Sequence, residues 1–143
     1  MSYEYLDDIA TADVAFRATG ASLEELFKAA AAATTNVMIE NLDSIRPETV
    51  RNFKRKEISV ELLLFHYLQE IIFLKDAEQL LLLPKNISIE KARAQFNLKA
   101  EFTGERIDTK RHHMNVDVKA VTFHQFKVTE TPRGWQALVV LDI

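Results

Sequence analysis

The sequence contains no cysteine, and only three glycines and three prolines occur among its 143 residues. Without cysteine there is neither a disulfide framework nor a thiolate ligand, so any bound metal must take oxygen or imidazole ligands. The glycines, at positions 20, 104 and 134, are too few and too scattered for a phosphate-binding loop or a dinucleotide-binding turn. No serine is flanked by glycines as in the nucleophile elbow of hydrolases. These absences exclude several classes of nucleotide-binding and acyl-transfer enzymes.

Long apolar runs and an excess of positive charge are also missing. No segment approaches the roughly 20 apolar residues that span a bilayer, and the start, "MSYEYLDD", lacks the basic and apolar parts of a signal peptide. We therefore expect a soluble, cytoplasmic protein with no membrane partner. The net charge of −3 argues against a main role in binding bare nucleic acid, because such binding needs Lys and Arg to displace counterions. If tRNA is involved, we expect the contact to be indirect, through another protein.

The apolar residues, 48% of the chain, are enough for one compact domain over residues 1–143. The stretch "ADVAFRAT" alternates in the manner of a strand with one buried face. The next stretch, "SLEELFKAAAAATTNVM", predicts a helix, because Ser22 and Glu25 have the spacing of a capping box. A second predicted helix, over 59–83, is apolar around most of its circumference and ends before Pro84. Such a helix is usually buried on more than one side.

The remaining segments predict strands and loops. A polar stretch after the first helix reads as a loop that leads into a short edge strand at 54–58. Beyond Asn86 the apolar residues alternate with period two, which predicts strands near 86–91, 93–103, 116–129 and 135–142. Pro132 and Gly134 have the spacing of a tight turn between the last two strands. The fold class is therefore α+β: a single domain with a mostly antiparallel sheet and two main helices packed on one face of it.

Acidic groups at two strand ends are the best candidates for a site. Asp13 opens the first predicted strand, and Asp142 and the terminal carboxylate close the last one. If these strands are neighbours, the carboxylates meet at one rim, where they repel one another unless a cation neutralises them. Hard cations such as Ca²⁺ and Mg²⁺ prefer oxygen ligands of this kind. The alternative is that Asp13 caps a turn and Asp142 lies in solvent.

Histidines and basic clusters give weaker signals. His66, His112, His113 and His124 do not have the spacing of a helical zinc motif, and a structural role is the simpler interpretation. A metal-dependent hydrolase that uses the two aspartates with one of His112, His113 or His124 is the enzymatic alternative. The clusters "RNFKRKE" and "KRHH" are typical of a solvated face, with a surface for a partner or RNA as the alternative.

A series of short stretches, in order from residue 3 to residue 143, resembles the archease family. They are "YEYLDD", "TADVAF", "GASLEELFKAAAAAT", "ISVELLLFHYLQEIIF", "GERIDTKRH", "VDVKAVTFH" and "WQALVVLDI". No single stretch is specific to the family, but the whole series is.

The resemblance implies a small α+β protein that is not itself an enzyme. Archeases act as accessory factors, or activators, of the tRNA-splicing RNA ligase, and they promote its guanylylation and its multiple turnover. The resemblance also implies a divalent cation, often calcium, bound by Asp13, Asp142 and the main-chain oxygens of Ile143. An alternative partner in the family is a tRNA methyltransferase, for which the protein would be a chaperone or specificity factor.

One departure from the family concerns the segment before Asp13. Many archeases have histidine immediately before the Thr-Ala-Asp motif, whereas this chain has Ala10 there. If that histidine assists contact with the metal or the ligase, we expect its role to be either missing here or taken by Asp8. Lys119 matches a recurrent family position, and we expect it to contact the partner or an acidic neighbour at the rim.

The final residues provide a test of the predicted cation site. A short extension beyond Ile143 converts the terminal carboxylate into a peptide group, so we expect weaker cation binding with the fold largely intact. Isothermal titration with Ca²⁺ measures the affinity, and far-UV circular dichroism checks the fold. Unchanged affinity in the extended protein would mean that the end of the chain is an ordinary solvent-exposed strand end.

Overall fold

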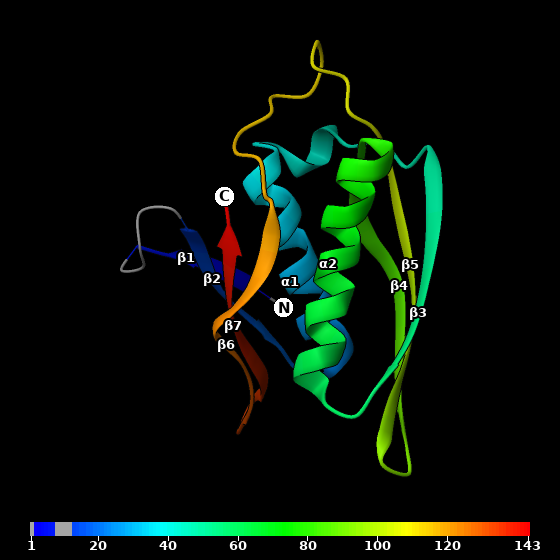
Figure 1. The fold of residues 1–143 in the computed structure, drawn as a ribbon, viewed down its shortest axis with the longest axis vertical. Coiled ribbons are helices and arrows are strands. Elements are labelled where there is room, and N and C mark those ends of the chain that lie inside the picture. Colours follow the sequence, from blue (N-terminus) through cyan, green and yellow to red (C-terminus); the bar gives the residue numbers. More distant parts are fainter. Residues whose placement is uncertain (1, 8–12) are drawn as a thin grey trace.

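Two helices lie between two antiparallel sheets in the computed structural model, which describes residues 2–7 and 13–143 (Figure 1). The first sheet has the order β1-β2-β7-β6, and the second has the order β3-β5-β4. The strands are β1 (Ser2–Leu6), β2 (Asp13–Gly20), β3 (Thr49–Glu57), β4 (Leu80–Ala92), β5 (Gln95–Arg106), β6 (Ala120–Thr131) and β7 (Gly134–Asp142). The α+β class is confirmed, with the strands divided between two sheets. No helix in the described ranges is long and apolar enough to cross a membrane.

Helix α1 (Leu23–Met38) begins at the predicted capping box. The Ser22 hydroxyl accepts a hydrogen bond from the backbone N–H of Glu25, and the Glu25 carboxylate accepts one from the backbone N–H of Ala21. Four alanines in the middle of the helix are completely buried: Ala29, Ala30, Ala31 and Ala33. Because alanine adds little bulk, α1 contacts β2 of one sheet and β4 of the other.

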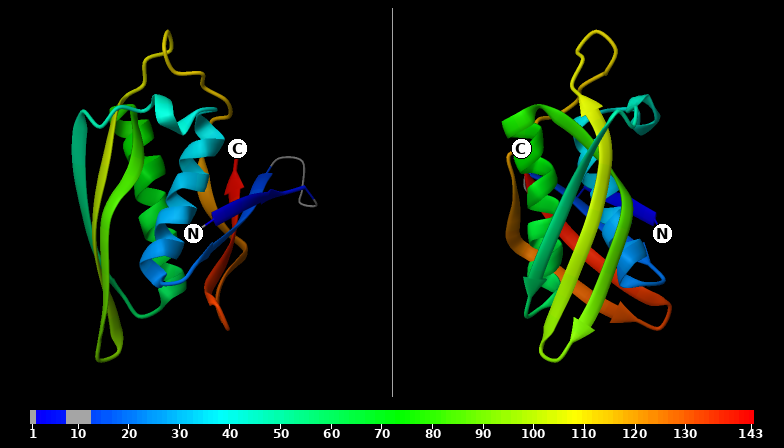
Figure 2. Two further views of the ribbon diagram at one scale, coloured as in Figure 1. Left: turned by 180° about the vertical axis from the view of Figure 1, so that it is seen from behind. Right: turned by 90° about the vertical axis from the view of Figure 1, so that its right-hand side faces the viewer.

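Helix α2 (Val60–Glu78) explains why a second sheet is needed. Its buried residues include Leu63, Leu64, Leu68, Ile71 and Ile72, which together cover about half of the helix circumference. The Tyr67 ring lies 5.5 Å from the Phe27 ring of α1 and 5.1 Å from the Phe102 ring of β5. A buried face this wide is covered from two directions: α2 packs against β3, β4 and β5 of one sheet and against β6 of the other (Figure 2), while its remaining side, with Phe73, faces solvent.

The predicted end of the second helix is wrong. Helix α2 ends at Glu78, where Gln79 takes the left-handed conformation with φ 56°, and the leucines at 80–83 begin strand β4. This strand continues past Pro84, where its pairing with β5 shifts register. Proline is tolerated there because β4 is an edge strand and a proline needs no ladder donor at a bulge.

Two further differences concern β1 and β3. Strand β1 pairs with β2 and has no counterpart in the sequence prediction, whereas β3 is longer than the predicted edge strand at 54–58. Its side chains alternate between half-buried and exposed along the whole strand, because every second residue faces the helices. The predicted hairpin between the last two strands is confirmed, with Thr131 paired to Gly134.

Gly104 in β5 provides a test of the packing between β4 and β5. A Cβ atom at this position would overlap the carbonyl oxygen of Leu81 in the facing backbone. We expect Gly104→Ala to lower the free energy of unfolding by about 2 kcal/mol, as overpacked core positions do. Urea denaturation measures this change. The neighbouring variant Thr103→Ala is the control, and it should cost less than about 1 kcal/mol; equal costs for both variants would contradict the steric argument.

Candidate functional site

The two aspartates expected to form a rim are cross-strand neighbours. Strands β2 and β7 are antiparallel, and Asp13 lies directly opposite Asp142. The next pair, Val14 and Leu141, packs into the hydrophobic core between the sheets. Because successive side chains alternate, both aspartates lie on the opposite face of the sheet, which faces away from the helices. Ile143 follows at the end marked C in Figure 1.

Among the described residues, no positively charged side chain forms an ion pair with the rim aspartates, Asp13 and Asp142. Like charges directly opposite one another on neighbouring strands destabilise a sheet. The adjacent pair on the same face, Ala15 and Val140, is buried and apolar. An apolar neighbourhood screens charge poorly, so it strengthens both the repulsion and the attraction of a cation.

Lys119 is brought to the same rim. Its backbone N–H donates a hydrogen bond of 2.8 Å to the carbonyl oxygen of Asp142, just before Ala120 pairs with Asp142 as the first residue of β6. The Lys119 side chain is exposed, and the ion pairs of the described residues do not include it. The structure thus places Asp13, Asp142, Ile143 and Lys119 at one end of the four-stranded sheet; we call this end the carboxylate rim.

A buried lysine positions the segment that leads to Lys119. Lys75 of α2 donates a hydrogen bond of 2.8 Å to the carbonyl oxygen of Val118 and forms ion pairs with Asp76 and Asp117. Burial by itself lowers the pKa of Lys75, but the hydrogen bonds to the two aspartates outweigh it, so the pKa lies above its usual value. Lys75 therefore stays charged and anchors the backbone beside the rim.

The histidines do not join the carboxylate rim in the described structure. His112 is buried, and both of its ring nitrogens are engaged: Nδ1 accepts from the backbone N–H of Asp108, and Nε2 lies 3.0 Å from the Glu105 carboxylate. His113 and His124 are exposed. Within residues 2–7 and 13–143, no three side chains of His, Cys, Asp or Glu form a group that could hold a metal. A cation at the rim would therefore depend on main-chain oxygens in addition to the two aspartates.

Two residues of the sequence prediction cannot be placed. Asp8 and Ala10 lie outside the described residues. The expected substitution of Asp8 for the family histidine stays a prediction.

A buried ionic network in the stretch "GERIDTKRH" has no counterpart among the sequence predictions. Glu105 is 4% exposed, and its carboxylate accepts hydrogen bonds from the backbone N–H of Arg46, from Arg111 and from the Nε2–H of His112. Arg111 also donates to the carbonyl oxygen of Ser44. The network holds the start of the loop between β5 and β6, whose other end carries Lys119. The only sequence signal is the density of charged residues in this stretch.

Glu105 predicts a dependence of stability on acid. Burial raises the pKa of its carboxyl, but the hydrogen bonds from Arg46, His112 and Arg111 outweigh burial, so the pKa lies below its usual value of 4.5. A carboxyl with a lowered pKa stabilises the fold above its usual value, and this contribution is lost as the pH falls toward the folded-state value. We expect Glu105→Gln to lower the free energy of unfolding by about 2 kcal/mol at pH 7.

The measurement for Glu105 is urea denaturation between pH 7 and pH 3. The loss of stability below pH 4.5 should be smaller in Glu105→Gln than in the unaltered protein. Glu90→Gln, at an exposed position of β4, is the matched control and should keep the original pH dependence. If the free energy of unfolding depends on pH in the same way in both variants, Glu105 does not cause the loss of stability in acid.

Comparisons with known proteins agree with this structure over nearly its whole length. Residues 3–143 match the model of the archease protein family (MTH1598/TM1083). The chain is 36% identical over 134 residues to protein archease of Pyrococcus abyssi, covering 93% of this chain and 94% of the relative. It is 35% identical over 142 residues to protein archease of Methanosarcina barkeri, covering 99% and 95% of the two chains. A protein archease-like of Drosophila melanogaster is 32% identical over 146 residues and covers 100% of this chain and 91% of its own length.

Solved structures show the same fold. The solution structure of Methanobacterium thermoautotrophicum protein 1598 has a TM-score of 0.82 and 29% sequence identity, covering 99% of this chain and 98% of that one. The crystal structure of an archease from Thermotoga maritima, described as a possible chaperone, has a TM-score of 0.57 and 23% identity, covering 94% and 93% of the two chains. The sequence matches together with this fold show that the chain belongs to the archease family.

Proposed function

We propose that this archease is a non-enzymatic accessory protein that activates the tRNA-splicing RNA ligase and carries one divalent cation at its carboxylate rim. In this role it promotes guanylylation of the ligase and multiple turnover, and it meets tRNA through the ligase. The observation that supports the rim as the functional site is the direct pairing of Asp13 with Asp142 on the face away from the core.

The donor chemistry at the rim fits a hard cation. Asp13 and Asp142 supply carboxylate oxygens from one face of the sheet, and Ile143 supplies main-chain oxygens beside them. Calcium is the first candidate, because it accepts irregular sets of carboxylate and carbonyl oxygens, whereas magnesium demands a near-ideal octahedron. A bound cation offsets the repulsion of the opposed carboxylates and offers positive charge to an acidic group of the partner.

Lys119 adds a fixed positive charge at the same end of the sheet. The Val118 backbone is held by Lys75, and the Lys119 backbone by Asp142, so the exposed ammonium group extends from an anchored segment. An anchored charge loses less freedom on binding than one on a loose loop. We therefore propose that Lys119 contacts the ligase next to the cation.

The hydrolase alternative receives no support from the described residues. It needs a histidine beside Asp13 and Asp142, and His112 uses both of its ring nitrogens in the network with Glu105 and Asp108. Because both ring nitrogens of His112 already form hydrogen bonds within the protein, His112 cannot accept a proton from a water molecule.

A chaperone or specificity factor for a tRNA methyltransferase is the second candidate. The Thermotoga maritima relative is described as a possible chaperone. Exposed aromatic groups are also available for contact with another protein: Phe123 is 63% exposed and stacks on Phe65 with the ring centres 4.0 Å apart. A competition experiment with the purified methyltransferase and the purified ligase would distinguish the two partners. The true partner should displace the other one from the archease.

The rim variants test the proposed function. We expect Asp13→Asn and Asp142→Asn each to weaken Ca²⁺ binding by at least about tenfold, because each removes one charged side-chain ligand. In a ligation assay with limiting ligase, both variants should restrict the reaction to about one turnover. Asp43→Asn removes one exposed negative charge from the short helix Leu42–Ser44 and is the matched control. Full multiple turnover with both rim variants would show that the rim is not the functional site.

A further inference from the structure

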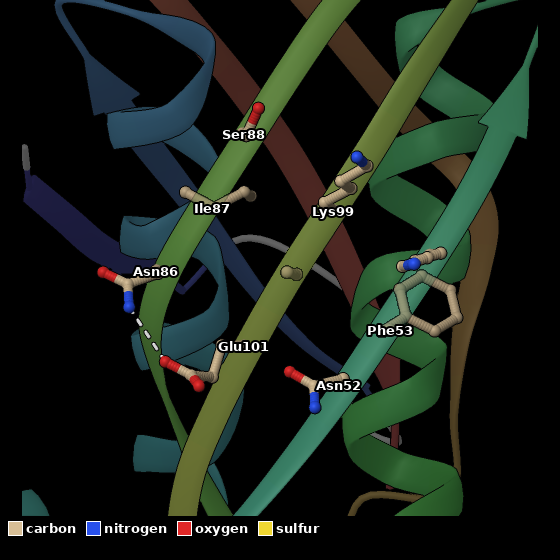
Figure 3. Close-up of a pocket in the computed structure, with 9 residues that line it drawn as sticks. Asn52, Phe53, Asn86, Ile87, Ser88, Lys99 and Glu101 are labelled. Carbon is tan, nitrogen blue, oxygen red and sulfur yellow. Dashed lines mark hydrogen bonds between the residues drawn. The ribbon is translucent and has the colours of Figure 1, made fainter.

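The outer face of the sheet β3-β5-β4 carries a shallow depression, lined by both polar and apolar residues, on the side away from the helices (Figure 3). It is built from the middle of all three strands. The side chains that line it include Asn52, Lys54, Asn86, Ser88, Lys99 and Glu101. It lies on a different sheet from the carboxylate rim, and no part of the proposed function uses it.

Strand β3 divides its basic cluster between two faces. Arg51 faces the helices and forms an ion pair of 2.7 Å with Glu78 of α2, and Arg55 forms one of 2.8 Å with Glu57. Lys54 lies on the opposite face and is exposed. Among the described residues its ammonium group has no carboxylate within ion-pair distance. The arginines are thus used within the fold, while Lys54, like Lys56 on the same outer face, is left for solvent or a ligand.

A second lysine without a carboxylate partner among the described residues lies directly opposite the first. Lys54 pairs in register with Lys99 of β5, and Lys99 pairs with Ser88 of β4, so one row crosses the sheet with two cations and a hydroxyl group. Like charges in directly opposed positions repel one another. An anion that lies between them removes this repulsion and gains two charge-assisted hydrogen bonds.

The adjacent row supplies a hydrogen-bond acceptor. Asn52, Glu101 and Asn86 lie side by side, and the Asn86 amide donates a hydrogen bond of 2.8 Å to the Glu101 carboxylate (Figure 3). A carboxylate so close to the lysines weakens a site for a simple anion. It can accept a hydrogen bond from a ligand hydroxyl group, however, so the depression offers cations and an acceptor in neighbouring rows.

We infer that this face binds the sugar-phosphate backbone of single-stranded RNA, with a phosphate on Lys54 and Lys99 and a ribose 2′-hydroxyl on Glu101. RNA presents both groups at short spacing, and the 2′-hydroxyl is the group by which proteins distinguish RNA from DNA. An acidic protein segment would use the lysines but would be repelled by Glu101. The inference goes beyond the proposed function, because it gives the archease a direct RNA contact of its own and does not depend on the ligase.

Fluorescence anisotropy with labelled single-stranded RNA and DNA of one mixed sequence tests the lysine pair without any ligase. We expect weak, salt-sensitive binding that favours RNA. The double variant Lys54→Gln/Lys99→Gln should bind RNA at least about fivefold more weakly, with a log-log salt slope shallower by about 0.7 for each phosphate that is no longer neutralised. The variant Lys110→Gln/Lys127→Gln removes the same charge from exposed positions outside this sheet and should keep the original affinity within about twofold.

Glu101→Gln tests the hydroxyl contact separately. The glutamine carbonyl still accepts from Asn86, so the fold should be retained, while removal of the negative charge strengthens DNA binding and abolishes the preference for RNA. Equal binding of RNA and DNA by the unaltered protein would overturn the inference, as would equal RNA affinities of the two lysine variants. Displacement of RNA by polyglutamate as readily as by unlabelled RNA would point instead to an acidic protein partner. Asp13→Asn should bind RNA normally, which separates this site from the carboxylate rim.

Discussion

Wide apolar faces on the two helices impose the constraint on which the rest of this structure depends. Helix α2 buries Leu64, Tyr67 and Ile71 along one broad face, and α1 contacts strands of both sheets through its alanines. Water must be excluded from all of these faces at once. Two separate sheets with the helices between them meet this requirement, and each sheet is then left with one outer face free for binding.

The free faces differ in charge because strand alternation sorts the side chains. On the four-stranded sheet, Val14 and Leu141 fill the core, so Asp13 and Asp142 are turned outward as a pair. On the three-stranded sheet, Phe53 packs against the core and Lys54 is turned outward opposite Lys99. Both faces therefore hold like charges in opposed positions. The molecule presents a negative rim on one sheet and a positive row on the other.

The sequence predicts the elements that depend on local chemistry. Ser22 with Glu25 specifies the start of α1, and the alternation around Phe16 specifies β2. The run of leucines at 80–83 is placed in the helix by its sequence pattern because a short apolar run fits a buried helix and a buried strand equally well. The left-handed Gln79, which ends α2, has no distinctive sequence signal because it is neither glycine nor asparagine.

The candidate site is predictable only where its residues lie at strand ends. Asp13 and Asp142 can be paired from the sequence because the first and last predicted strands are available as neighbours, and the register then places them opposite one another. The network around Glu105 cannot be predicted from the sequence, because its partners Arg46 and His112 come from loops whose path is set by tertiary packing. Long-range contacts of buried charged groups leave little local pattern in a single sequence.

The position of β7 inside its sheet has a consequence for how the protein is made. This strand lies between β2 and β6, yet it leaves the ribosome after every other helix and strand of the described fold. Both helices and the whole three-stranded sheet can collapse earlier, and β2 can pair with β1, whereas the other edge of β2 must wait for β7, more than 100 residues downstream. Until then, the edge of β2 that pairs with β7 is open to solvent or to other nascent chains. The sheet that carries the rim is thus the part of the molecule most open to misassembly during synthesis.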